Sequence, residues 1–182
     1  MATQAYGYLL AFTCIPTILN EYWTAEPNVR MGCLKVLTFV FEYVGPQSAY
    51  YVDSVVTMLE DALTERDLVR RQTASIIAKH LALGCVGLGC EDTMLHLMNL
   101  VWPNGFETSP HIIGTVIGAI EAMGPALGPG VLLSYTLQGL FHQARTVCEV
   151  RLLYGTSFSN ADLRHLGTGI LVCLQFTVSW CC

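Results

Sequence analysis

The feature that most constrains this chain is an internal repeat of about 40 residues. Equivalent branched apolar residues recur at Val29, Val69, Ile112 and Val147, at successive spacings of 40, 43 and 35 residues. In the first three segments a glycine follows 15 or 16 residues later, which is room for a helix of about four turns. A period of roughly 40 to 47 residues is typical of repeats made of two packed helices. We therefore expect an all-α fold of stacked helical hairpins.

Each repeat also contains a segment that suits a first helix. The expected first helices cover residues 16–22, 49–63, 93–102 and 131–140. In the second of them the apolar residues fall at steps of three and four, which places them on one helical face. These residues are Val52, Val55, Val56, Leu59 and Leu63. No alternating strand pattern with hairpin turns recurs. The sequence thus predicts a HEAT-repeat α-solenoid of about four helical hairpins, of which the last is incomplete.

Characteristic pairs of residues mark several helix boundaries. Ser109-Pro110 pairs a capping hydroxyl with a proline at the first helical position. Two glycine–proline pairs mark helix ends, Gly45-Pro46 and Gly128-Pro129. In each, the glycine can adopt the left-handed backbone conformation that ends a helix, and the proline cannot continue the helix. These pairs indicate where one hairpin ends and the next begins.

The string from Asp67 to Arg71 is the most informative part of the repeat. We expect Asp67 to cap its helix and to complement the helix dipole. Val69 is expected to enter the core, as the corresponding valine does in helices of this type. Arg70 or Arg71 is then expected to pair with an acidic residue in the adjacent repeat. This interpretation gives the whole string a structural role.

The same region also supplies the candidate contact site for RNA or for a partner protein, which consists of Arg66, Arg70, Arg71 and Lys79. Arg71 and Lys79 are eight residues apart on an expected helix, so they share roughly one face. No further Lys or Arg occurs before Arg145, and the net charge of the chain is -5. A long stretch without cations does not neutralise phosphates by itself. Any RNA contact is therefore expected at this cluster or through partners.

Motifs for metal binding, nucleotide binding and catalysis are weak. Cys85 and Cys90, flanked by His80 and His96, come nearest to metal-ligand spacing, but the second half of a zinc site is missing. The glycine string at 84–90 lacks the spacing of a phosphate loop and has no preceding strand. No motif pairs a nucleophile with a base. We expect no cofactor, no bound metal and no enzymatic activity.

Composition favours a chain whose surface is covered by other protein. Apolar residues make up 53% and charged residues 13%, where soluble domains carry roughly 25% charged residues. No uninterrupted apolar run reaches the length of about 20 residues that a membrane span needs, so we expect no membrane association. Several of the eight cysteines fall in apolar helical patterns, which indicates a reducing compartment. For the isolated chain we expect low solubility or obligate partner binding.

Several strings go beyond a generic repeat pattern. They are 19–22, 41–45, 59–63, 66–69, 71–75, 89–92, 101–104, 106–111 and 137–142. In this order and spacing they closely resemble the C-terminal HEAT repeats of the large subunit of splicing factor 3b. The resemblance covers about Phe12 to Val150, and the part from Trp102 to His111 is the most specific.

The resemblance implies a non-enzymatic nuclear scaffold in pre-mRNA splicing. The family protein is a HEAT superhelix in the small nuclear ribonucleoprotein that recognises the intron branch site, and it clamps the branch helix near a small zinc-finger subunit. The implied partners are the other splicing factor 3b subunits, small nuclear ribonucleoprotein proteins, and pre-mRNA or small nuclear RNA through the complex. Alternatives on the same fold are an adaptor for transport or complex assembly, and a non-functional truncated product.

The resemblance stops after Val150. Gln143 stands where the family has a proline, and Cys148 stands where it has a basic residue. We therefore expect residues 1–150 to form the HEAT-repeat solenoid and residues 151–182 to form a divergent, poorly ordered tail. Because the family protein is several times longer, the chain is expected to be a truncated or variant copy.

Overall fold

The computed structural model of this chain describes residues 2–24, 26–107 and 109–140, with side chains from residue 13 to residue 135. Within these residues nearly all of the backbone is helical, and no β-strand occurs. The expected all-α class is confirmed. The α-helices are α1 (Ala2–Thr24), α2 (Pro27–Val44), α3 (Val52–Thr64), α4 (Leu68–Gly84), α5 (Glu91–Val101), α6 (Pro110–Leu127) and α7 (Pro129–Leu140), with 3-10 helices η1 (Gly45–Tyr51) and η2 (Trp102–Phe106).

Three of the expected hairpins are present, and they consist of α1 with α2, α3 with α4, and α5 with α6. Two expected boundaries were wrong. Helix α1 begins at Ala2 and contains Pro16 in its interior, so the helix continues through a residue that removes one backbone hydrogen bond and usually kinks or ends a helix. Helix α3 begins at Val52 instead of Ala49, because η1 takes up the residues after Gly45.

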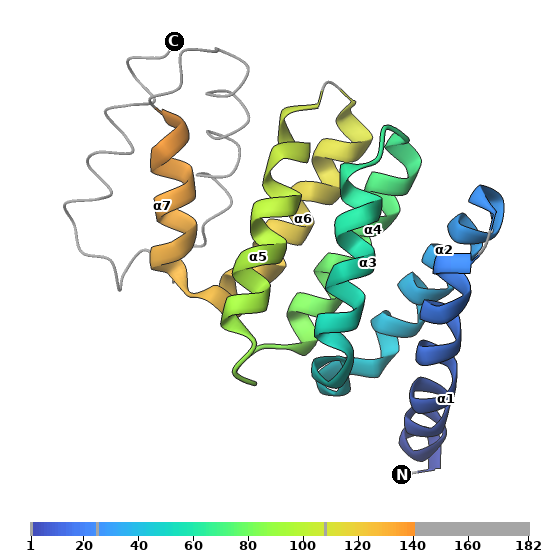
Figure 1. Cartoon of the computed structure of the whole chain (residues 1–182). Coiled ribbons are helices and arrows are strands. Elements are labelled where there is room, and N and C mark those ends of the chain that lie inside the picture. The colour runs from blue at the N-terminus through green and yellow to red at the C-terminus, as the bar shows by residue number, and fades with distance from the viewer. Residues whose placement is uncertain (1, 25, 108, 141–182) are drawn as a thin grey trace. The chain divides into compact units, whose positions relative to one another are not determined.

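The helices of the first compact unit, Met1–Ala126, form two layers. The first helices α1, α3 and α5 lie in one layer, and the second helices α2, α4 and α6 lie behind them (Figure 1). Apolar side chains from both layers fill the space between them. The largest fully buried ones include Leu34, Leu37, Phe41, Met58, Leu59, Ile77, Leu81, Met94 and Leu97. Each hairpin thus shares one continuous core with the next.

The residues predicted to mark helix ends lie at the ends of helices in the structure. The Asp67 carboxylate accepts a hydrogen bond from the backbone N–H of Val69 at 2.9 Å, which caps α4. Gly45 and Gly128 both have positive φ, at 60° and 82°, where residues with a Cβ are strained. Pro110 is the first residue of α6.

Val69 does not enter the core, so that expectation was wrong. Its side chain is 54% exposed, and Arg70 is the first buried residue of α4. Val29 in the preceding repeat is exposed as well, whereas the equivalent Ile112 is buried. In α4 the side chain of Arg70 is buried instead, because carboxylates and a carbonyl oxygen surround its guanidinium.

A close approach between η1 and α4 fixes the second hairpin to the end of α2. Gly84 is buried, and a Cβ at this position would collide with the Ser48 hydroxyl and the Gly45 carbonyl. Ser48 is fully buried, and its Oγ lies 3.9 Å from Cys85 Sγ. Only glycine leaves room for the two segments here.

Residues from Leu127 onward belong to a second compact unit. Its described part is α7, which agrees with the expected first helix of the fourth hairpin at 131–140. The second helix expected near Val147 and the tail at 151–182 lie outside the described residues. In the described chain, no helix combines the length and apolarity needed to cross a membrane.

Candidate functional site

Arg70 is a buried hub that joins the first hairpin to the second. Its side chain is 8% exposed, and Nη1 donates to both carboxylate oxygens of Glu65 at 2.6 and 2.5 Å. Its Nη2 donates to the backbone carbonyl of Pro27, the first residue of α2, at 2.8 Å. Hydrogen bonding to Glu65 is the main reason why the pKa of the Arg70 guanidinium is raised. Arg70 is therefore held inside the protein through both of its Nη atoms, whereas its buried Nε has no hydrogen-bond partner among the described residues and lies 3.7 Å from Asp67 Oδ2.

Arg71 makes the equivalent connection from the second hairpin to the third. Its Nη1 donates to Glu107 Oε1 at 2.6 Å and to Asn104 Oδ1 at 3.1 Å. Asn104 is buried, and its Nδ2 donates to the Leu100 carbonyl at 3.0 Å, so the amide is held in place. Of the two arginines, Arg71 is thus the one that pairs with an acid of the adjacent repeat.

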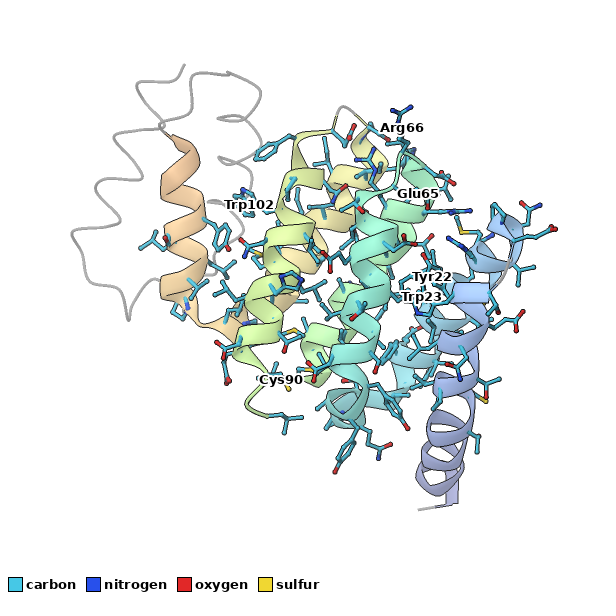
Figure 2. All side chains as sticks on the ribbon, in the orientation of Figure 1. Tyr22, Trp23, Glu65, Arg66, Cys90 and Trp102 are labelled. Atoms are coloured by element: carbon cyan, nitrogen blue, oxygen red, sulfur yellow. The ribbon has the colours of Figure 1, made fainter. Side chains whose placement is uncertain are left out.

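A second contact between the first two hairpins involves an aromatic ring. The Tyr22 hydroxyl donates to Asp61 Oδ2 at 2.7 Å, and the Arg30 guanidinium carbon lies 5.7 Å from the centre of the Tyr22 ring. Arg30 Nη1 is also 4.0 Å from Asp61 Oδ2. Burial, followed by the hydrogen bond to Asp61, raises the pKa of the Tyr22 hydroxyl well above its usual value. Tyr22 lies between α1 and α3 in Figure 2.

The outer surface of α3 and α5 is acidic. Its exposed carboxylates are Asp53 and Glu60 on α3 and Glu91 and Asp92 on α5. Two of them also link these helices, because Thr93 Oγ1 donates to Asp53 at 3.1 Å and His96 Nε2 lies 3.6 Å from Glu60. These exposed contacts add little stability, since water screens them.

The four members of the basic cluster do not form one surface. Arg70 and Arg71 are bound internally, whereas Arg66 and Lys79 are exposed. Figure 2 shows Glu65 and Arg66 at the turn between α3 and α4. Lys79 lies near α6, since its Cδ is 3.8 Å from the position of a Cβ on Gly118. Within the described residues, Arg66 and Lys79 are therefore the two members of the cluster whose charges are exposed.

The exposed face of α2 is a surface that sequence reasoning missed. It carries Val36, Phe39 and Tyr43, which are 49%, 64% and 70% exposed. The rings of Phe39 and Tyr43 are 5.0 Å apart and pack on each other, so they form one patch. The sequence signal that could have revealed this surface is the spacing of seven residues from Val29 to Val36 and again to Tyr43.

Cys85 and Cys90, the nearest metal-ligand pair in the sequence, lie at the two ends of the loop between α4 and α5. Cys85 is 2% exposed, and burial raises the pKa of its thiol to about 11. His80 lies on α4, and burial lowers its pKa although Glu42 opposes the change. His96 faces Glu60 instead. In the described part of the chain, no three such side chains gather around a possible metal position.

The different environments of the two thiols predict different reactivity. At pH 8 we expect iodoacetamide to modify Cys90 at least about tenfold faster than Cys85, because Cys85 is buried and about one in a thousand of its thiols is ionised. Tandem mass spectrometry after a short pulse distinguishes the two sites. In denaturant both should react at similar rates, and equal rates in the native chain would contradict the described burial.

No protein-family profile matches the chain. Two relatives do. The U2 snRNP component prp10 of Schizosaccharomyces pombe is 47% identical over 152 residues, which are 84% of this chain and 12% of the relative. The U2 snRNP component HSH155 of Saccharomyces cerevisiae is 53% identical over 126 residues, which are 69% of this chain and 13% of the relative. The chain spans only these small fractions of the two relatives.

Stacked two-helix units with a shared core and polar contacts between neighbouring hairpins define a helical-repeat protein of the HEAT type. Over this region the chain is similar to the U2 snRNP components prp10 and HSH155, which agrees with its resemblance to the large HEAT-repeat subunit of splicing factor 3b. The resemblance seen in the sequence is thereby confirmed.

Proposed function

We propose that this chain is a non-enzymatic scaffold in pre-mRNA splicing and that it acts in association with the U2 snRNP in the nucleus. The observation that carries this proposal is the 47% to 53% identity to two U2 snRNP components. The aligned 152 residues of one relative include most of the described hairpins. A polar link such as Arg71 to Glu107 orients one hairpin on the next and gives a scaffold fixed faces for partners.

The proposed partners are other splicing factor 3b subunits and small nuclear ribonucleoprotein proteins, with RNA contacted through the complex. Within the basic cluster, Arg66 and Lys79 are the residues we propose for direct contact, because their charges are exposed. Arg70 and Arg71 support the contact by holding the hairpins in place. Two exposed cations supply only a small part of the charge that an RNA-binding surface needs, which fits a contact made inside a larger assembly.

The test is purification of the tagged full chain from nuclear extract. We expect U2 small nuclear RNA and splicing factor 3b subunits to co-purify with it, measured by reverse transcription and mass spectrometry. Recovery of neither, from a folded chain, would overturn the proposed function. Recovery dominated by transport factors would favour an adaptor role instead.

A pair of variants tests the two exposed cations. The R66Q/K79Q variant is expected to recover about threefold less U2 RNA than the unmodified chain, because each lost phosphate contact weakens binding. The S54D/T57E variant makes the same change in net charge on the exposed surface of α3 and is expected to leave recovery unchanged. Equal losses in both variants would show that net charge matters and that Arg66 and Lys79 do not contact the assembly.

A further inference from the structure

Helix α2 presents a continuous apolar stripe on the side opposite to its buried face. The stripe consists of Val29, Gly32, Val36, Phe39 and Tyr43, all of which are exposed. These residues alternate at steps of three and four. The buried face holds Cys33, Leu34, Leu37 and Phe41. A helix with apolar residues on both sides has a second packing surface.

The spacing of the stripe is that of a coiled-coil seam. Val29, Val36 and Tyr43 repeat every seven residues, and Gly32 and Phe39 fall three residues after the first two. In a heptad these positions face a partner helix and pack into the spaces between its side chains. The stripe is therefore suited to another helix that lies nearly parallel or antiparallel to α2.

The charged residues beside the stripe indicate which helix can bind it. Lys35 and Glu42 are exposed, lie seven residues apart, and each precedes a residue of the seam. In the described part of the chain neither forms an ion pair. Along one flank the charge is positive near one end and negative near the other. Such a flank is complementary to itself when it is turned end to end.

We propose that the stripe on α2 binds α2 of a second copy of this chain in antiparallel orientation. The twofold axis crosses the stripe at the level midway between residues 37 and 38 along α2. It brings Lys35 of each copy next to Glu42 of the other, so two ion pairs form at once. The same register places Val36 against Phe39 of the second copy. The interface is isologous, because both copies use the same surface.

In this register a large side chain of one copy faces a position without a side chain on the other. Tyr43 of one copy lies over Gly32 of the other, and nothing else in the described chain lies within 4 Å of a Cβ position on Gly32. The absence of a side chain there lets the two helices approach closely. Phe39 and Tyr43, which are largely exposed in the single chain, become covered in the pair. Burial of four aromatic rings across the pair is the main source of binding energy.

One helix from each copy gives a small interface, so we expect a dissociation constant on the order of 10 µM. Sedimentation equilibrium of the full chain at about 1 to 100 µM measures it. The F39E variant should be monomeric throughout this range, because it buries a carboxylate against Val36 of the second copy. L88E places the same charge on an exposed leucine in the loop between α4 and α5 and should associate like the unmodified chain.

Charge exchange tests the antiparallel register. K35E and E42K should each weaken association about tenfold, because each places like charges opposite one another. The double variant K35E/E42K restores both pairs in reverse and should recover the original association. An equimolar mixture of the two single variants should form mixed dimers. Circular dichroism establishes that every variant remains helical.

Three results would overturn the proposal. One is a chain that stays monomeric at 100 µM. Another is association that F39E leaves unchanged, since the interface would then lie elsewhere. The third is a double charge exchange that associates no better than either single one, since that would exclude the antiparallel register.

Discussion

Replacing Gly84 with alanine is expected to lower the free energy of unfolding by about 2 to 3 kcal/mol. In an open helix the same change is stabilising by up to about 1 kcal/mol, because alanine has the higher helix propensity. At Gly84 the added Cβ collides with the Ser48 hydroxyl and with the backbone carbonyl of Gly45. A hydroxyl can rotate away, but the carbonyl belongs to a glycine whose φ of 60° already fixes the end of α2. Either α4 or η1 must therefore move.

Urea denaturation followed by circular dichroism measures this effect, and G114A is the matched control. Gly114 also lies in a helix, but a Cβ there meets nothing within 4 Å. G114A should be as stable as the unmodified chain or slightly more stable. If G84A and G114A unfold at the same urea concentration, the close approach of η1 and α4 is wrong.

Replacing Arg70 with methionine is expected to lower the free energy of unfolding by about 2 kcal/mol. Methionine keeps the length and the apolar stem of the side chain, so the packing loss is small. It removes the donor to the Pro27 carbonyl and the partner of Glu65. Breaking a buried ion pair costs roughly 3 to 5 kcal/mol, but Glu65 is 39% exposed and recovers part of its hydration.

R66M is the control for this variant, because Arg66 is exposed and four residues away in the sequence. It should change the stability by no more than about 0.5 kcal/mol. R70K should fall between the two, since lysine keeps the charge but cannot reach Glu65 and Pro27 together. A loss in R66M equal to that in R70M would contradict the role of Arg70 as the hub between the first two hairpins.

The repeat and the helix boundaries were predictable because they depend on local chemistry. Glycine followed by proline ends a helix wherever it occurs, and a period near 40 residues leaves few alternatives to paired helices. The cap by Asp67 was predictable for the same reason. What the sequence did not reveal is which side chains turn inward, because this depends on neighbours far away in the chain.

The arginine pair illustrates that limit. Arg70 and Arg71 are adjacent, so their side chains point about 100° apart on the helix. One reaches Pro27 and the other reaches Glu107, which are 43 and 36 residues away. Which arginine contacts which hairpin therefore depends on how the hairpins stack. For the same reason Val69 was placed in the core when it lies outside, and the basic cluster was treated as one site.

The acidic outer surface of α3 and α5 affects how any polyanion meets this chain. Asp53, Glu60, Glu91 and Asp92 produce a negative potential on one broad side, whereas the exposed charges on helices of the other layer are mixed, with Lys35 and Lys79 beside Glu42 and Glu121. At physiological ionic strength this potential reaches about 8 Å into the solvent, so it acts as a molecule arrives and not from afar. A phosphate backbone is repelled from the first side before it makes contact. The uneven field therefore orients the encounter by turning an approaching polyanion away from the acidic side.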